Sequence, residues 1–166
     1  MEPGKSTKQK NSVRFIISSC GSYLEIFSVY VDECLKTLVQ NHLPTYIISS
    51  DQVVYTLAKN FTERLPPGAK LFSVDAIGMY SNIDRDRGIY AVRQFVKKYK
   101  DHTDEFRTSP VFISESLKLI MKNNVFQFGD TFWRQLNGTA MVTSCAVNYA
   151  FLYVRILEIE QLLKDF

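Results

Sequence analysis

The chain has 166 residues, of which 46% are hydrophobic and 22% charged, and its formal net charge is +3. This composition excludes wholesale disorder and fibrous repeats, and the small net charge identifies no partner by itself. Charge interrupts the apolar stretches, so we expect no transmembrane helix, and the polar, lysine-bearing start predicts no secretory signal. The three cysteines are widely spaced and form no Cys-x-x-Cys pair, which favours a reducing compartment without disulfides or zinc.

The first part of the chain predicts a strand and two helices. Residues 13–18 are short, β-branched and apolar, as is typical of a strand. Apolar residues recur at three- and four-residue steps over 22–40, which predicts a helix with one buried face. Asp51 offers an N-cap for a second helix, whose apolar stripe comprises Val53, Val54, Leu57 and Phe61.

The second part predicts further helices and a hairpin. Asp84 or Asp86 can cap a helix that runs to Tyr99, and Ser109 followed by a proline starts another helix. The pair Gly129-Asp130 is a hairpin signal between two short apolar segments. The first of these helices carries Ile89, Val92 and Val96, and the second stops at Asn123-Asn124. The other expected elements are a strand over 70–76, a hairpin over 125–135 and a helix over 144–164. The fold class is therefore α+β, with helices packed on a small antiparallel sheet.

Positive charge gathers in two segments, 1–14 and 85–100. The second segment holds a single acid, Asp86, against six bases, which are Arg85, Arg87, Arg93, Lys97, Lys98 and Lys100. Such clusters suit contacts with phosphates. A solvated helix face or a frayed tail is the simpler explanation of such clusters when charge is the sole evidence.

Residues 71–84 have the pattern of a phosphate-transfer site. An apolar segment ends at Asp75, a compact turn containing Gly78 follows, and Tyr80 comes five positions after the acid. A carboxylate there can hold Mg²⁺, and the backbone N–H groups of the turn can face phosphate oxygens. The ring of Tyr80 can pack under a sugar and exclude a 2′-hydroxyl. An aspartate that merely caps the next turn is the structural alternative.

A second segment, residues 134–154, leads from the hairpin into the last helix through small residues. Small side chains around Gly138 let another body approach the backbone closely, as a template base or a nucleotide does. Close packing between helices is the alternative, and composition alone does not separate the two.

These segments together resemble the reverse transcriptase of Penelope-like retroelements, a relative of telomerase reverse transcriptase. The resemblance spans nearly the whole chain. The co-ordered motifs are Lys5 and Lys8 before Arg14, then RFIISSCGS (14–22), LPPGAKLFSVDAIGMYSNID (65–84) and RQLNGTAMVTSCAVNYAFLYV (134–154). The resemblance implies right-hand polymerase architecture, with a fingers-like part over 1–64 and a partial palm over 65–166.

The resemblance also implies a role for each matching residue. Asp75 matches the catalytic carboxylate that binds two Mg²⁺ ions, with the carbonyl of Ala76 beside it. The residues that match nucleotide contacts are Arg14, Gly78, Met79, Tyr80 (the steric gate), Gln135 and Gly138, and Lys5 and Lys8 match contacts to phosphates. The implied partners are an RNA or DNA template–primer and deoxynucleoside triphosphates, without a membrane, and the implied location is intracellular, the nucleus rather than the cytoplasm.

The sequence departs from this family at its second metal-binding motif. Two-metal nucleotidyl transfer needs clustered carboxylates from more than one strand, and the family supplies the others as aromatic-x-Asp-Asp, whereas no Asp-Asp pair occurs here. We therefore expect a fragment or degenerate copy of an RNA-directed DNA polymerase that is inactive as this chain. The alternatives are a non-catalytic nucleic-acid-binding module and a protein-interaction module that uses the open edge of the palm.

Overall fold

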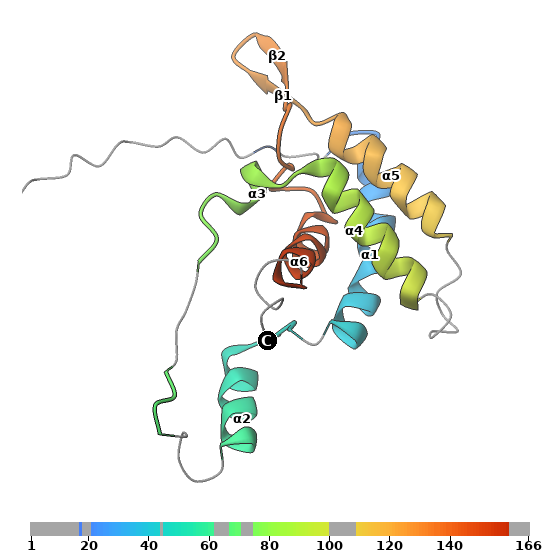
Figure 1. The fold of residues 1–166 in the computed structure, drawn as a ribbon. Helices are drawn as coiled ribbons and strands as arrows, with labels where there is room; N and C mark the ends of the chain where they lie inside the picture. The colour runs from blue at the N-terminus through green and yellow to red at the C-terminus, as the bar shows by residue number, and fades with distance from the viewer. Residues whose placement is uncertain are drawn as a thin grey trace, which may run out of the picture.

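The computed structural model describes residues 17, 21–43, 45–61, 67–70, 75–99 and 109–159. In these ranges the chain forms mainly helices, with one small antiparallel sheet (Figure 1). The elements in chain order are α1 (Glu25–His42), α2 (Ser50–Asn60), α3 (Met79–Asn82), α4 (Arg85–Tyr99), α5 (Pro110–Lys122), β1 (Val125–Phe128), β2 (Thr131–Arg134) and α6 (Ala146–Leu157).

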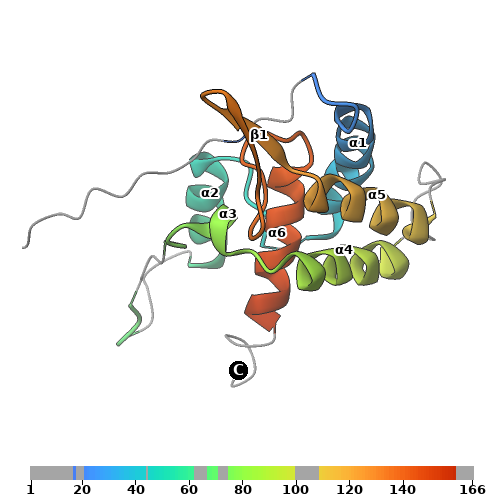
Figure 2. The same cartoon turned by 90° about the horizontal axis from the view of Figure 1, so that it is seen from above.

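Helices α1, α4, α5 and α6 enclose the hydrophobic core. Helix α4 packs against both α5 and α6, and α1 packs against the same two helices from another side. Figure 2 shows α4 and α5 lying side by side, with α6 beside them. The apolar face of each helix supplies fully buried side chains, among them Val31, Leu35, Leu38, Val92, Val96, Ile113, Leu117, Ile120 and Leu152. Burial of these faces is the main stabilising contribution to the fold.

A tyrosine of α6 fixes the start of α4. Tyr149 is fully buried, and its hydroxyl donates to the carbonyl of Arg85 at 3.0 Å. Its ring lies directly on Gly88, where an added Cβ would collide with the phenol oxygen and stand 2.5 Å from Cζ. Burial raises the pKa of Tyr149 above its ordinary value, so the hydroxyl remains a donor. Only glycine at position 88 allows this approach of the two helices.

Two polar contacts join α1 to α6 within the same core. The hydroxyl of Ser28 accepts from the backbone N–H of Cys145 at 3.2 Å, and burial raises the pKa of the Cys145 thiol to about 11. The side-chain amide of Asn148 donates to the carboxylate of Asp32 at 2.8 Å. Partial burial nevertheless raises the pKa of Asp32, because desolvation of the carboxylate outweighs the effect of this hydrogen bond.

The sheet lies outside the core. Strands β1 and β2 pair in the register Phe126↔Trp133, and nearly all of their residues are exposed. The mixed helix-and-sheet class is confirmed. In the described residues the helices pack chiefly on one another and not on this hairpin; the other expected strands lie mostly outside those residues, so the packing of helices on a larger sheet stays a prediction. A two-stranded hairpin offers too little apolar area to organise four helices.

The expected ends of α4 and α5 agree with the structure, whereas α1 (Glu25–His42) is shifted from the expected 22–40 and α6 begins at Ala146 in place of residue 144. The hydroxyl of Ser109 accepts from the N–H of Val111, with a proline at the first helical position, and the carboxylate of Asp84 accepts from the N–H of Arg87 at 2.9 Å. The hairpin turns at Gly129-Asp130, as expected. Most of the strand over 13–18 and most of the strand over 70–76 lie outside the described residues. The described residues of these two segments, which are Ile17, Lys70, Asp75 and Ala76, belong to no strand.

The cap of α2 was predicted incorrectly. Its N-cap is Ser49, which is extended and accepts from the N–H of Gln52, while Asp51 lies inside the first turn. The side chain of Gln52 in turn accepts from the N–H of Ile48, an arrangement close to a capping box. The helix forms where predicted, but it has no buried residue and stands apart from the other helices (Figure 1).

The expected division into 1–64 and 65–166 stays a prediction. Helix α1, from the first part, shares one core with α4, α5 and α6 from the second. No helix among the described residues has the length and apolar character needed to cross a membrane.

Replacing Gly88 by alanine tests the contact with Tyr149. Alanine favours a helix over glycine by about 0.8–1.0 kcal/mol, whereas overpacking a filled core costs typically about 1–3 kcal/mol. We expect Gly88→Ala to lower the free energy of unfolding, measured by denaturant titration. Gln94→Ala, at an exposed position of α4, is the control and should be neutral or slightly stabilising. A stabilised Gly88→Ala would contradict the close packing.

The raised pKa of Asp32 predicts a pH-dependent effect of its replacement. Since folding disfavours the charged form, the stability that this group contributes is present below its ordinary value of 3.8 and is lost as pH rises through the folded-state pKa. We expect Asp32→Asn to have a higher Tm than the parent chain at neutral pH and an equal Tm near pH 3, by thermal denaturation.

Asp32→Ala separates the charge from the hydrogen bond. This variant leaves the buried amide of Asn148 without its acceptor, so its Tm should fall at every pH. Equal Tm differences for Asp32→Asn at both pH values would show that burying the ionised carboxylate of Asp32 does not destabilise the fold.

Candidate functional site

A left-handed glycine starts the short helix at the centre of the candidate site. Gly78 has φ +60° and ψ +36°, a conformation that L side chains adopt rarely. Its carbonyl accepts from the N–H groups of Ser81 and Asn82 and from the hydroxyl of Ser81. These bonds close the turn that the sequence predicted and form α3, which presents Met79 and Tyr80 beside the segment that precedes α6.

Gly138 brings that segment directly against α3. It has φ +71°, and an added Cβ would collide with the carbonyl oxygen of Tyr80 and lie 2.7 Å from Cα of Ser81. The next residue, Thr139, donates its N–H to the carbonyl of Tyr80 at 2.8 Å. The body that approaches Gly138 is therefore the backbone of α3, so close packing accounts for the position of this glycine.

Four hydrogen bonds hold the base of the hairpin next to this junction. The guanidinium of Arg85 donates to the carbonyls of Met121, at the end of α5, and of Gln135, after β2. The backbone N–H of Gln135 donates to the carbonyl of Asn124 at 2.8 Å. The hydroxyl of the buried Thr139 donates to the sulfur of Met121. The end of α5, the hairpin and the segment before α6 are therefore tied to the start of α4.

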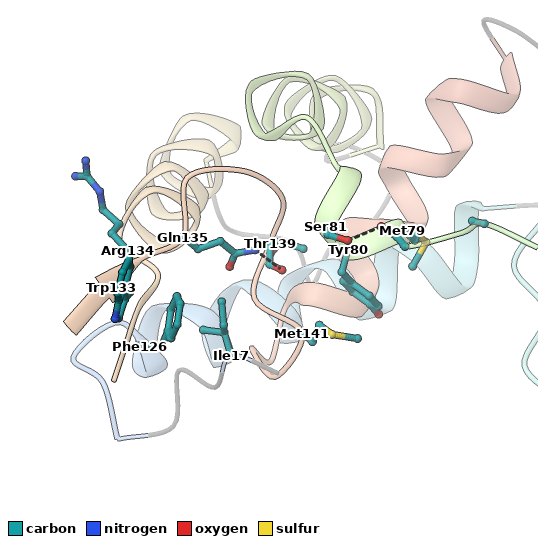
Figure 3. A pocket seen from close by; sticks show the side chains of 12 residues that line it. Ile17, Met79, Tyr80, Ser81, Phe126, Trp133, Arg134, Gln135, Thr139 and Met141 are labelled. Carbon is teal, nitrogen blue, oxygen red and sulfur yellow. Dashed lines mark hydrogen bonds between the residues drawn. The ribbon is translucent and has the colours of Figure 1, made fainter. Parts of the chain in front are cut away.

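A cavity of about 490 Å³ lies between α3, the hairpin and the segment before α6. Figure 3 shows Tyr80 and Met141 on one side of it and Phe126 and Trp133 on the other. The residues that line it are Ile17, Ala76, Gly78, Met79, Tyr80, Ser81, Phe126, Trp133, Arg134, Gln135, Thr139 and Met141. The walls are mainly apolar and aromatic, which suits a flat ring or a sugar.

Polar groups in the lining are few. The amide nitrogen of Gln135 donates to the carbonyl of Thr139 at 3.3 Å, whereas its buried Oε1 has no hydrogen-bond partner. Arg134 contributes to the wall, but its guanidinium points away from the cavity (Figure 3). The orphaned oxygen of Gln135 is a place for a ligand N–H or O–H to bind.

The structure brings together several residues that the sequence singled out. Ala76, Gly78, Met79, Tyr80 and Gln135 all line the one cavity. Gly138 lies behind its wall, Asp75 is exposed next to Ala76, and Lys5, Lys8 and Arg14 lie outside the described residues. The catalytic and binding roles assigned to these residues stay predictions.

The described residues do not fit a two-metal centre. They contain no group of three or more His, Cys, Asp or Glu side chains that could hold a metal ion. A pair of Mg²⁺ ions needs several clustered carboxylates, and the described part of the chain holds no such cluster.

Sequence reasoning missed the wall that the hairpin supplies. Phe126 and Trp133 face each other across β1 and β2, so their side chains share one face of the hairpin. The aromatic residues of VFQF and TFWR were the available signal, since paired aromatic residues on one hairpin face indicate a surface that packs against something. Ile17 and Met141 complete the lining.

Substitutions at two left-handed glycines test the junction with α3. Gly129 has φ +60° but open space around it, whereas Gly138 meets backbone atoms that cannot rotate away. Alanine in the left-handed region costs about 1–2 kcal/mol by itself. We expect Gly129→Ala to lose about this much stability and Gly138→Ala to lose clearly more, by denaturant titration. Equal losses would show that the close contact of Gly138 with Tyr80 and Ser81 adds no cost to a side chain at that position.

Comparisons with known proteins identify no relative of this chain. No protein-family model, curated protein or solved structure matches the chain. The resemblance to reverse transcriptases rests on the sequence motifs alone.

Proposed function

We propose that this chain is a fingers-and-palm unit of the reverse-transcriptase kind that binds a nucleotide, or the end of a template–primer, in the cavity next to Tyr80. The observation that carries the proposal is that the 76–81 turn and the 133–141 segment line one cavity. The resemblance assigns these two segments, far apart in the sequence, to the same nucleotide. Chance similarity of either motif gives no reason for them to meet.

The residues of the cavity suit a nucleoside better than a highly charged ligand. The rings of Phe126 and Trp133 can stack on a base. Tyr80 and Met141 on the opposite side can pack against the sugar, which is where the resemblance places a steric gate. Oε1 of Gln135 can accept from an N–H or O–H group of the ligand.

Nucleotidyl transfer is not part of what we propose for this chain by itself. The described residues form no cluster of three or more His, Cys, Asp or Glu side chains, and the two ions that the reaction of the family uses need several carboxylates. Binding without chemistry is therefore the activity that the site supports best. We expect no primer extension from this chain alone.

A second candidate function is a protein-interaction module. Exposed apolar side chains gather on α1 and on the start of α5, where Tyr30 meets Phe112 edge to face at 5.8 Å. Ile26 is 77% exposed and Tyr23 97%. Apolar surface of this kind is typical of sites that another protein covers.

The single tryptophan of the chain provides the test, because Trp133 lines the cavity and is 55% exposed. We expect its emission to change saturably when a deoxynucleoside triphosphate or a short primer–template is added. Tyr80→Ala should weaken this binding at least several-fold, because it removes one wall of the cavity. Free tryptophan in the same titration corrects for light absorbed by the nucleotide.

Tyr55→Ala is the matched control for Tyr80→Ala. Tyr55 is a 68% exposed tyrosine on α2, away from the cavity, so its loss should leave the titration unchanged. No saturable change at millimolar nucleotide or with a primer–template would refute the binding proposal. A mass that rises with protein concentration in light scattering without nucleic acid, together with that null result, would favour the protein-interaction module.

A further inference from the structure

The outer face of α4 carries a row of positive charge that the cavity does not use. We call it the α4 stripe; its members are Tyr90, Arg93, Gln94, Lys97 and Lys98, all exposed and all on one side of the helix. Their spacing of three and four residues aligns them along the helix axis. No acidic residue occurs in α4 after Asp86 in its first turn.

The opposite face of α4 is buried in the hydrophobic core. Ile89, Val92 and Val96 are buried against the neighbouring helices. Apart from the ring of Tyr90, the α4 stripe therefore has no apolar side chain free to enter a lipid bilayer, whereas an interfacial membrane helix needs a whole apolar face. Its partner must be recognised through charge and hydrogen bonding.

Three carboxylates on α4 and on the elements around it pair with bases outside the α4 stripe. Asp86 pairs with Lys122 at 3.4 Å, and Glu115 of α5 pairs with Lys118. Glu158, just after α6, pairs with Arg155. In the described part of the chain, none of the bases of the α4 stripe pairs with an acid; Lys98 instead lies 5.1 Å from the centre of the Tyr99 ring. The positive charge of the stripe is thus uncompensated within the described fold.

Stabilisation of the helix explains only part of this pattern. Cations in the last turn of a helix interact favourably with its dipole, and Lys97 and Lys98 lie there. Arg93 lies a full turn earlier, where the dipole effect has faded. A surface helix ordinarily gains solubility from mixed charges and from i,i+4 ion pairs, and the α4 stripe has neither.

We infer that the α4 stripe binds the sugar–phosphate backbone of a nucleic acid. Four helical residues rise about 6 Å, which places Arg93 and Lys97 about one turn apart in a row, as the regular charges of a strand require. Gln94 can donate to a phosphate or sugar oxygen, and the ring of Tyr90, 57% exposed, can pack on a sugar or an unpaired base. This inference does not depend on the cavity, because the two surfaces share no residue.

The salt dependence of binding tests the α4 stripe. Each phosphate contact to a duplex contributes about 0.9 to the slope of log K against log salt. We expect the triple variant Arg93→Ala/Lys97→Ala/Lys98→Ala, in the full chain with a labelled primer–template duplex, to have a slope shallower by about 2–3. The variant Arg93→Lys/Lys97→Arg/Lys98→Arg keeps the charges and should keep the slope.

The control removes the same charge from elsewhere on the surface. Lys36→Ala/Lys59→Ala/Lys70→Ala also loses three exposed lysines, so it has the same net charge as the first triple variant. We expect it to keep the slope of the parent chain. The single change Lys97→Glu repeats the test with one exposed side chain, and a fall in affinity there would support the inference. Circular dichroism checks that each variant is folded.

Several outcomes would overturn the inference. Equal slope changes in the two Ala triple variants would show that only net charge matters. Polyglutamate and anionic phospholipid vesicles are the competing probes. If either binds the parent chain as tightly as the duplex does, and binds the Arg93 triple variant less tightly, the partner of the α4 stripe is an acidic protein or a membrane. Emission of Trp133 reports the cavity separately, so failure at the α4 stripe leaves the cavity proposal standing.

Discussion

The contact between Tyr149 and Gly88 is the constraint on which the rest of the described structure depends. A full phenol ring lies where any other residue at position 88 would place its Cβ, and its hydroxyl holds the carbonyl of Arg85. The same arginine then reaches the end of α5 and the base of the hairpin through its guanidinium. One buried aromatic residue thereby aligns three segments that are distant in the sequence.

The cavity is a consequence of that alignment. Because the base of the hairpin is tied to the start of α4, the segment after β2 passes next to α3, and Gly138 allows the two backbones to touch. Tyr80 and Trp133 then line one cavity, although the elements that carry them, α3 and β2, are far apart in the sequence. The walls hold rings and sulfur in place of carboxylates, which is the physical basis for proposing a nucleoside as the ligand of this cavity.

Two surfaces of opposite character remain outside the core. The outer side of α1 is apolar over its first turns, whereas the α4 stripe is basic. Both helices contribute their other face to the same core, so neither outer face is needed for folding. Surfaces that folding does not require are free to serve binding, and their different chemistry suits them to different kinds of partner.

The sequence by itself determined the local structure. Apolar periodicity located the helices, Ser109 and Asp84 capped two of them as expected, and Gly129-Asp130 turned the hairpin. These features depend on residues within a few positions of one another, so their physics is contained in a short stretch of sequence. The capping of α2 by Ser49 was equally local, and the pattern of a serine followed three residues later by Gln52 was there to be recognised.

Tertiary structure decided everything that required distant segments to meet. Spacing alone left the partner of Gly138 open between a ligand and a neighbouring backbone, and the answer depends on where α3 is placed by Tyr149 and Arg85. It also decided that the helices pack on one another and that the apolar stripe of α2 stays uncovered. Periodicity shows that a face is apolar, but only the packed chain determines what covers it.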